Sequence, residues 1–410
     1  MKKEILLLSL ICIGFYSYSQ QWSFLGFPNE SIYDVAVHPV NPDIIFVSSE
    51  EGYLYKSSDG GLIWDTVSFY PFNQIIFYPD NPDTMYATFG GGSYSDGIYK
   101  SIDGGNSWNL LKWLYLATSI TIPGYPQGTI IVGAKETGVY ESSDYGNSWS
   151  VINDSLGNLN ILSLTHINPM DCDSGQVLFA GTEGGIFYYD YDNGGPWYNT
   201  NTPTNSQVHA LSSDNICYLW AAIDGNSNSA GMYKSTYGIT WDISEYWDFI
   251  TDILINPLNL SPIYEPNTIY AADSVYGVKR TVNGGVSWET INDGLEDSVV
   301  FCLAQSPADT TLLYAGTSNG IYVWDISADI EEVSNKNCII IYPNPANEYI
   351  TIEGIYPGRI EIMNLQGKII KKLNTSGTKT EIDISKLESG VYTIRIETNE
   401  EIIMKKFVKE

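Results

Sequence analysis

Short runs of alternating apolar and polar residues recur along most of the chain, and polar turns separate them. In each unit a Gly precedes one such run, as in "GYLYKS" from Gly52 and "GIYKS" from Gly97, and successive units begin 41 to 47 residues apart. Apolar residues at alternate positions predict half-buried strands, and helical periodicity is nearly absent. The units begin at Gly52, Gly97, Gly138, Gly185, Gly231, Gly277 and Gly320.

Each unit carries signals for four strands. A second apolar run precedes the Gly ("IIFVSS", "TMYATF", "VLFAGT"), and a third lies further upstream, often before a proline turn ("VAVHPVNPD", "IIFYPDNPD"). A Trp downstream begins a fourth run, as in "SWSVIN". Four short strands in each of seven units predict an all-β chain that contains a seven-bladed β-propeller. The 31 Tyr and 11 Trp residues suit pleated, half-buried surfaces.

The seventh unit lacks its fourth strand, because no Trp follows "GIYVWDIS" at 320–327. A matching run without a unit of its own, "QWSFLG", lies at 21–26. We therefore expect Trp22 and the residues after it to complete the seventh blade, which leaves the ring without an unpaired edge.

A polar turn, Ser-x-Asp-x-Gly-x-x-Trp, is expected to join strands three and four. Its Asp can accept hydrogen bonds from N–H groups of the turn, its Gly allows a backbone conformation that other residues resist, and its Trp packs beneath. Altered copies lie at 190–197, 234–241 and 281–288. A motif copied so often favours a structural role, and each turn has too few carboxylates for calcium, so we expect neither metal nor cofactor. The intact copies comprise Ser57, Asp59, Gly61, Trp64, Ser101, Asp103, Gly105, Trp108, Ser142, Asp144, Gly146 and Trp149.

This turn resembles the Asp-box, or BNR repeat, of sialidases, sortilin-type propellers, photosystem II stability factors and xyloglucan-cleaving glycoside hydrolases. The resemblance covers residues 21–326, and the pattern "NPDTMYAT…GIYKSIDGGNSW" is most similar to the xyloglucanase and sortilin types. It implies the propeller fold but says little about activity. A sialidase holds its substrate's carboxylate with three arginines, and this region contains only Arg280, so sialidase activity is close to excluded.

Both ends of the chain carry export signals. Residues 1–19 combine a basic start, an apolar core from Ile5 to Tyr16 and small residues Ser17 and Ser19, which is typical of a signal peptide. This apolar run is too short to span a membrane, and no other apolar stretch is long enough to span one as a helix. We expect the propeller to occupy 20–326, a polar linker 327–337 and a second domain 338–410.

The C-terminal segment resembles the sorting domain of the type IX secretion system. The motifs are "IIIYPNPANEYITIEG" at 339–354, "RIEIMNLQGKIIKKL" at 359–373, "EIDISKLESGVYTIRIE" at 381–397 and a lysine-rich last strand. The pattern itself predicts a small β-sandwich. The resemblance implies a Bacteroidetes-type bacterium, Sec export, the type IX machinery as a partner, and a protein that is secreted or attached to the outer-membrane surface. Its characteristic residues are Pro343, Asn344, Pro345, Gly367, Gly390 and Tyr392.

Charge divides the chain into two parts. Residues 20–335 contain seven basic and 37 acidic residues, a net formal charge of −30, whereas the segment from Lys336 onward carries about +1. The acidic part repels phosphate backbones and anionic lipids, which excludes nucleic acid as a partner. Cys217 and Cys302 lie in apolar runs, as buried thiols do. The three histidines, His38, His166 and His209, suggest packing and no catalytic triad or metal site.

Two functions remain open from the sequence: a non-catalytic module that binds glycan or protein, and a xyloglucanase-like glycoside hydrolase that uses two carboxylates. The face opposite the Asp-box turns carries the loops between strands two and three and between blades. Aromatic side chains beside carboxylates on these loops suit sugar recognition. The candidates are Glu51, Asp96 and Asp224 for catalysis, with Glu136, Glu183 and Asp273 as further loop acids, and Tyr70, Tyr94, Trp113, Tyr115, Tyr246 and Trp247 for ligand binding by a monomer.

Overall fold

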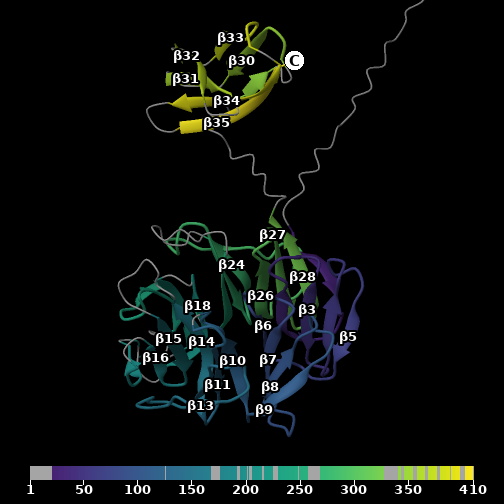
Figure 1. The fold of residues 1–410 in the computed structure, drawn as a ribbon, viewed down its shortest axis with the longest axis vertical. Helices are drawn as coiled ribbons and strands as arrows, with labels where there is room; N and C mark the ends of the chain where they lie inside the picture. The colour runs from purple at the N-terminus through teal and green to yellow at the C-terminus, as the bar shows by residue number, and fades with distance from the viewer. Residues whose placement is uncertain are drawn as a thin grey trace, which may run out of the picture. The chain divides into compact units, whose positions relative to one another are not determined.

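The structure is a computed structural model, and it forms two compact units, Met1–Asp329 and Ile330–Glu410. Figure 1 shows that both units consist of strands. Within the described part of the chain, no helix has the length and apolar character needed to cross a membrane. The predicted signal peptide (1–19), the predicted linker (327–337) and Pro343, Asn344, Pro345 and Gly367 lie outside the described residues. Those are 21–124, 126–167, 176–191, 194–200, 202, 206–214, 217–224, 230–247, 249–256, 268–326, 340–342, 346–353, 358–364, 368–375, 379–387, 389–397 and 402–409.

The first unit is the predicted propeller, built of seven four-stranded antiparallel sheets within its described residues. In the first four blades the strands run from the innermost outward in chain order. Blade one is β2 (Ile32–Val37), β3 (Ile45–Ser49), β4 (Leu54–Ser57) and β5 (Asp65–Ser68); blade two is β6 (Gln74–Phe77), β7 (Met85–Phe89), β8 (Gly97–Ser101) and β9 (Asn109–Trp113); blade three is β10 (Ala117–Thr121), β11 (Ile130–Ala134), β12 (Gly138–Ser142) and β13 (Ser150–Val151); and blade four is β14 (Ile161–Ile167), β15 (Val177–Thr182), β16 (Gly185–Asp190) and β17 (Tyr198–Asn199).

The last three blades complete the ring. Blade five is β18 (Gln207–Ser213), β19 (Tyr218–Asp224), β20 (Gly231–Thr236) and β21 (Asp242–Glu245); blade six is β22 (Ile250–Ile255), β23 (Ile269–Asp273), β24 (Gly277–Thr281) and β25 (Glu289–Thr290); and blade seven is β26 (Val300–Ser306), β27 (Asp309–Thr317), β28 (Gly320–Asp325) and β1 (Ser23–Gly26). The innermost strands β2 and β26 contact each other, and in Figure 1 the purple strands of blade one lie beside the green strands of blade seven.

The N-terminal strand β1 completes blade seven, as expected from the sequence. It pairs with β28 in antiparallel fashion, with Ser23 opposite Val323. Trp22, just before β1, is 2% exposed and stacks on Trp324 of β28 with ring centroids 6.0 Å apart. The outermost strand therefore carries its own buried anchor.

Adjacent blades pack through apolar side chains of their two inner strands. One cluster joins blade seven to blade one and contains Ile32, Val47, Tyr314 and Ile321, all nearly inaccessible to solvent. Since each β-sheet faces a neighbour on both sides, its inner strands read as continuous apolar runs, such as "IIVGA" in β11, in which every residue is buried. Similar clusters fill the other interfaces in the described chain.

A strand-three lysine links several blades to their neighbours. The Lys56 ammonium lies 5.6 Å from the ring centre of Phe46 and donates a hydrogen bond of 2.8 Å to the Gly104 carbonyl in the next blade's turn. On the other side of the same interface, a Cβ at Gly105, whose φ is +79°, would lie 2.3 Å from Phe46. The glycine of the turn is thus required by close packing as well as by backbone conformation.

The Asp-box turns share one hydrogen-bond pattern, shown most fully in blade two. The Asp103 carboxylate accepts a hydrogen bond of 2.8 Å from the Ser101 hydroxyl. It accepts two more from Ser107, one of 2.9 Å from the main-chain N–H and one of 2.6 Å from the hydroxyl. The Gly105 N–H donates to Ser101 Oγ, and the Trp108 indole donates to the Gly105 carbonyl. These hydrogen bonds, led by the one from Ser107 Oγ, lower the pKa of Asp103 to about 2.

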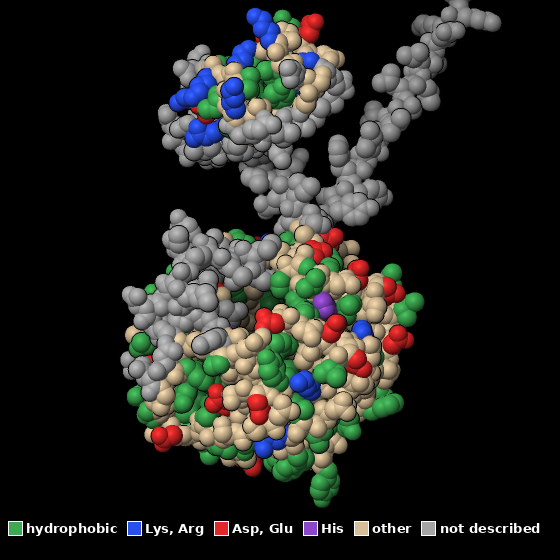
Figure 2. Space-filling view, viewed as in Figure 1, with side chains coloured by type: hydrophobic (Ala, Val, Ile, Leu, Met, Phe, Trp, Pro, Cys, Tyr) green, Lys and Arg blue, Asp and Glu red, His purple; other side chains and the backbone are tan. Residues whose placement is uncertain are grey.

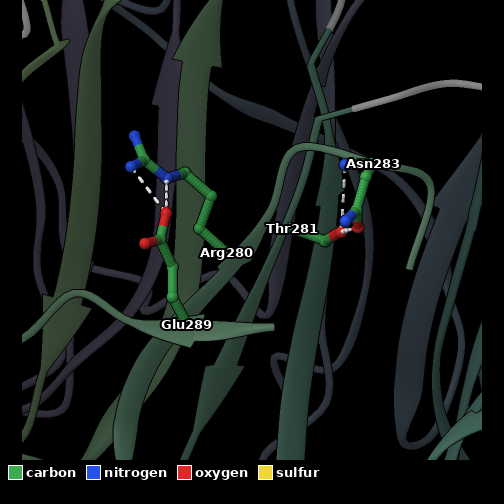
Figure 3. A network of polar contacts seen from close by, with 4 residues as sticks. All are labelled: Arg280, Thr281, Asn283 and Glu289. Atoms are coloured by element: carbon green, nitrogen blue, oxygen red, sulfur yellow. Dashed lines mark hydrogen bonds and ion pairs between the residues drawn. The ribbon is translucent and has the colours of Figure 1, made fainter. Parts of the chain in front are cut away.

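The altered copy in blade six keeps this pattern with different side chains. The Thr281 hydroxyl donates to Asn283 Oδ1 at 2.9 Å, and Figure 3 shows these residues at the end of β24. The same figure shows Arg280, whose guanidinium forms an ion pair of 2.6 Å with Glu289 and lies 5.0 Å from the Trp324 ring centre. The turn therefore tolerates loss of the carboxylate, as expected of a structural motif.

The second unit contains two sheets that enclose a core of isoleucines, including Ile350, Ile362 and Ile394. Tyr392 is buried there and stacks on Phe407 with ring centroids 5.6 Å apart. Gly390, the residue two before it, opens the strand β34. The sheets are β29 (Ile340–Tyr342), β30 (Tyr349–Glu353) and β33 (Lys379–Asp383), and β32 (Ile369–Thr375), β31 (Gly358–Met363), β34 (Gly390–Glu397) and β35 (Ile402–Lys409).

Candidate functional site at the channel mouth

The innermost strand of six blades contains a bulge near its start. The register of pairing shifts between Ile32 and Asp34 in β2 and between Ile250 and Asp252 in β22, and β10, β14, β18 and β26 shift at the equivalent position. A bulge re-aims the side chain of its extra residue, and bulges often lie beside functional sites. The bulged residues are Tyr33, Thr118, Leu162, His209, Thr251 and Phe301, and all of them line an axial cavity.

This axial cavity has a volume of about 340 Å³, and all seven blades contribute to its wall. A second cavity of about 610 Å³ shares Tyr33, Asn73, His209 and Thr251 with it. The second cavity also touches the segment before β6 and the glycines after β7. Those segments are an inter-blade connection and a loop between strands two and three, so the channel opens on the face opposite the Asp-box turns.

Two carboxylates lie in the cavity wall. Asp34 Oδ2 accepts a hydrogen bond of 2.7 Å from the Ile75 N–H, and Asp252 Oδ2 accepts one of 2.8 Å from the Leu303 N–H, each in the next blade. Burial raises the pKa of Asp34 to about 8, aided by the negative charge of Asp252 and opposed by the Ile75 N–H. Burial also raises the pKa of Asp252, to about 6. Both acids link neighbouring blades and place ionisable carboxyl groups in the wall of the axial cavity.

The mouth of the channel combines aromatic and ionisable groups. Tyr33, with 42% of its surface exposed, makes an edge contact with Phe301 at a centroid distance of 5.6 Å. His209 Nε2 lies 3.0 Å from Asp224 Oδ2, and this contact is the leading cause of the lowered pKa of Asp224. Aromatic faces, an imidazole and a carboxylate therefore surround one opening, a typical composition for a binding site.

The predicted catalytic acids do not share this environment. Asp96 is fully buried in the loop between β7 and β8, where its carboxylate accepts main-chain hydrogen bonds from Gly91, Ser93 and Leu116. Burial raises the pKa of Asp96, but the hydrogen bonds from the N–H groups of Leu116, Ser93 and Gly92 and from the Ser93 hydroxyl outweigh it and lower the pKa overall. Glu51 is exposed in the corresponding loop of blade one. Of the three candidates only Asp224, through His209, is joined to the channel mouth.

Asp273, one of the further loop acids, is fully buried and holds the predicted ligand-binding residue Trp247. The Trp247 indole donates a 2.8 Å hydrogen bond to Asp273, and the Lys279 ammonium lies 3.8 Å from the indole ring centre. Trp247 is itself only 7% exposed. Its described contacts are those of an inter-blade packing residue. Of the other loop acids, Glu183 accepts a hydrogen bond from Asn160, whereas Glu136 lies at a loop position with positive φ.

Four of the remaining predicted aromatics are exposed. Trp113 and Tyr115 lie 6.4 Å apart between ring centroids with an interplanar angle of 28°, which presents two roughly parallel rings. Tyr94 and Tyr246 are more exposed than either. Tyr70 instead packs on Tyr99 in the core between blades one and two.

Most basic side chains of the propeller are engaged in packing. Aromatic rings lie within cation–π distance of six of its seven basic groups, those of Lys56, Lys100, Lys112, Lys234, Lys279 and Arg280. Figure 2 shows acidic side chains spread over one face of the propeller with few basic ones among them. Neither cavity has a lysine or arginine in its described lining. The site is therefore unsuited to anionic ligands.

The two axial carboxylates and the position of His209 at the channel mouth were not predicted from the sequence. An acidic residue inside a run that otherwise reads as a buried inner strand, as in "IYDVAV" for Asp34 and "ITDILI" for Asp252, was the available signal. His166 fits the expectation that the histidines are packing residues, since burial lowers its pKa to about 4. Cys217 and Cys302 are buried, and neither forms a disulfide bond within the described residues. In the described residues no group of three or more His, Cys, Asp or Glu side chains could hold a metal ion.

Comparisons with known proteins assign the C-terminal unit. Residues 340–410 match the family model of the secretion system C-terminal sorting domain. Comparison with curated protein sequences found no significant match. The sorting domain indicates export through the type IX secretion system to the cell surface or the extracellular space.

Solved structures similar to the chain are β-propellers of several kinds. YCF48 bound to D1 peptide is 16% identical, with a TM-score of 0.54, and the match covers 75% of this chain and 97% of that one. PorZ, a surface component of the type IX secretion system of Porphyromonas gingivalis, is 14% identical with a TM-score of 0.53, over 95% of this chain and 60% of that one. A GH74 enzyme of Niastella koreensis is 15% identical with a TM-score of 0.58, and the match covers 82% of this chain and 59% of that one.

At these identities the likeness establishes the fold and leaves the activity open. The chain spans only about 60% of PorZ and of the GH74 enzyme. The protein is thus an exported β-propeller followed by a type IX secretion system C-terminal sorting domain.

Proposed function

We propose that the protein is a non-catalytic binding module, exported by the type IX system, that takes its ligand on the propeller face around the channel mouth. The observation that carries this proposal is the continuous pair of cavities that opens between Tyr33, His209 and Thr251 on the loop face. The exposed rings of Trp113 and Tyr115 extend the binding surface outward. Aromatic groups beside a few oriented polar groups support recognition of a peptide or a glycan.

The state of the candidate acids supports binding over hydrolysis. A glycoside hydrolase needs two carboxyl groups that face one sugar across an open cleft. Asp96 is enclosed by main-chain N–H groups, and Asp224 is held by His209, so neither carboxylate is poised for such a role. The exported sorting tail is consistent with a ligand at the cell surface or in the medium.

An array experiment tests the proposal. The mature protein would be applied to immobilised glycans and to a peptide array, while the same preparation is incubated with soluble polysaccharides and the release of reducing ends is measured. We expect saturable binding on an array, with no new reducing ends. Steady release of reducing ends that is lost in a carboxylate variant would instead establish the hydrolase alternative.

A further inference from the structure

The axial cavity has features that point to a particular ligand chemistry, and the inference drawn from them rests on the proposed binding function. Asp34 and Asp252 both line it, on β2 and β22. Besides its hydrogen bond from the next blade, Asp252 accepts one of 2.8 Å from the Ile253 N–H through Oδ1. Each acid keeps further acceptor capacity, because an ionised carboxylate has about four lone-pair sites. Of the charged residue types, only Asp and His occur among the described lining residues.

A second observation is independent of these acids. Ser119 also lines the cavity, is 6% exposed, and its hydroxyl is buried with no hydrogen-bond partner among the described residues. A buried hydroxyl without a hydrogen-bond partner carries a desolvation cost. A donor that entered the cavity would remove this cost.

The mouth adds groups that suit a cation on an apolar stem. The rings of Tyr33 and Phe301 meet edge to face at the entrance, and aromatic faces attract ammonium groups. A cavity of about 340 Å³ below an entrance of about 610 Å³ accommodates a narrow side chain. The net charge of −30 over residues 20–335 also draws cations toward the propeller.

We propose that the axial cavity binds an alkyl-ammonium group, as carried by a lysine side chain or a polyamine, with Asp34 and Asp252 as its counter-charges and Ser119 as a neutral acceptor. The stem of the ligand lies against the exposed ring surfaces of Tyr33 and Phe301 at the mouth. Ammonium ligands therefore bind in preference to neutral or anionic ones of the same length.

Binding of a cation is coupled to protonation of the cavity. The titratable groups that face Asp34 and Asp252 are Cys302 on β26 and, at the rim, His209 and Tyr33, whereas β6, β10 and β14 contribute only uncharged lining residues. The raised pKa values of the two acids mean that both are partly protonated near neutral pH. An ammonium ligand favours their ionised forms, so its binding releases protons and strengthens as pH rises.

Calorimetry with defined probes tests the inference. The probes are a glycine peptide with one central lysine, the same peptide with Nε-acetyl-lysine, and spermidine. We expect the lysine peptide or spermidine to bind with an affinity that rises about tenfold or more from about pH 5.5 to about pH 8.5, with proton release measured in two buffers. The acetylated peptide should not bind. Binding of spermidine alone would identify a polyamine as the source of the ammonium group, and binding of the peptide would identify a protein ligand.

Matched variants separate the cavity from the overall charge. Asp34→Asn and Asp252→Asn each remove one negative charge from the cavity, and an Asn side chain can still accept the main-chain hydrogen bond. Asp65→Asn removes the same charge from an exposed position on β5. The cavity variants should weaken binding about tenfold or more, and Asp65→Asn should leave it nearly unchanged. Melting temperatures identify any variant that fails to fold, in which case the other variant and the pH series remain decisive.

Equal losses in all three variants, or equal binding of the acetylated peptide, would overturn the inference. An array ligand whose binding is unaffected by Asp34→Asn and Asp252→Asn would also overturn it while leaving the proposed binding function in place. The proposed function would fail separately, if the array experiment revealed hydrolysis.

Discussion

The indole N–H of Trp22 donates a 2.5 Å hydrogen bond to the carbonyl oxygen of Ile291, 269 positions further along the chain. The main-chain N–H of Trp22 also donates to the Asp293 carbonyl. Trp22 thus ties blade seven to blade six. Trp197 has the equivalent arrangement, since its indole donates to the Ile152 carbonyl and its main chain to the Asp154 carbonyl.

Loss of this anchor should destabilise the whole ring. Trp22→Ala removes a buried indole and its hydrogen bond, and we expect a loss of about 3–5 kcal/mol in the free energy of unfolding. Trp197→Ala is the matched control, because it removes the same contacts at a blade whose strands are contiguous in sequence. Thermal unfolding followed by circular dichroism would measure both. An unchanged melting temperature for Trp22→Ala contradicts closure by β1.

Removal of an Asp-box carboxylate should affect stability alone. Asp103→Ala deletes the acceptor for Ser101 and Ser107, and we expect a loss of about 1 kcal/mol with binding of any array ligand unchanged. The measurements are denaturant unfolding and titration of the ligand. Loss of binding at unchanged stability would show that the Asp-box face holds the ligand.

The stability of the propeller should fall as pH rises through the neutral range. The pKa of Asp34 is raised to about 8 in the folded state, from about 3.9 in the unfolded chain. The protonated carboxyl therefore adds to the free energy of unfolding. This contribution is fully present below about pH 3.9 and is lost as pH rises through about 8. Asp252 acts in the same direction up to about pH 6. We expect a lower melting temperature at about pH 8.5 than at about pH 5, and a smaller difference in Asp34→Asn. Identical pH profiles for the two proteins would show that Asp34 does not control this loss.

The C-terminal unit should act in export and not in binding. A chain that ends at Ile326 is expected to fold and keep its ligand but remain in the periplasm, because the two units have separate cores. Residues 327–410, placed behind a signal peptide and a fluorescent domain, should reach the surface or medium of a type IX-competent host. Fractionation of both proteins, with a translocon mutant as control, measures this. A truncated propeller that reaches the surface would contradict the assignment.

The propeller could be predicted because its information is repeated. Turns such as 101–108 and strands such as β8 recur at a regular spacing along the sequence. Each repeat therefore predicts the same order of strands within a blade. The exposed pair Trp113 and Tyr115 could also be placed on a face from topology alone. The axial site could not be predicted in this way, because Asp34 and Asp252 lie far apart in the sequence. They line the same cavity only once the ring of blades has closed. The burial of Asp96 was equally hidden, since a loop acid that is solvated and one that binds its own backbone look alike in sequence.

The proposed binding of a ligand at the channel mouth is tested most directly by locating the ligand on the propeller. Binding of the array ligand would be measured for two double variants, Tyr33→Ala with Phe301→Ala at the channel mouth and Leu62→Ser with Val286→Ser on the exposed Asp-box turns. Both pairs lie on the surface, and melting temperatures confirm that each variant is folded. We expect the channel-mouth variant to lose about tenfold or more in affinity and the Asp-box variant to bind normally. Normal binding by the channel-mouth variant, with loss in the Asp-box variant, would contradict it.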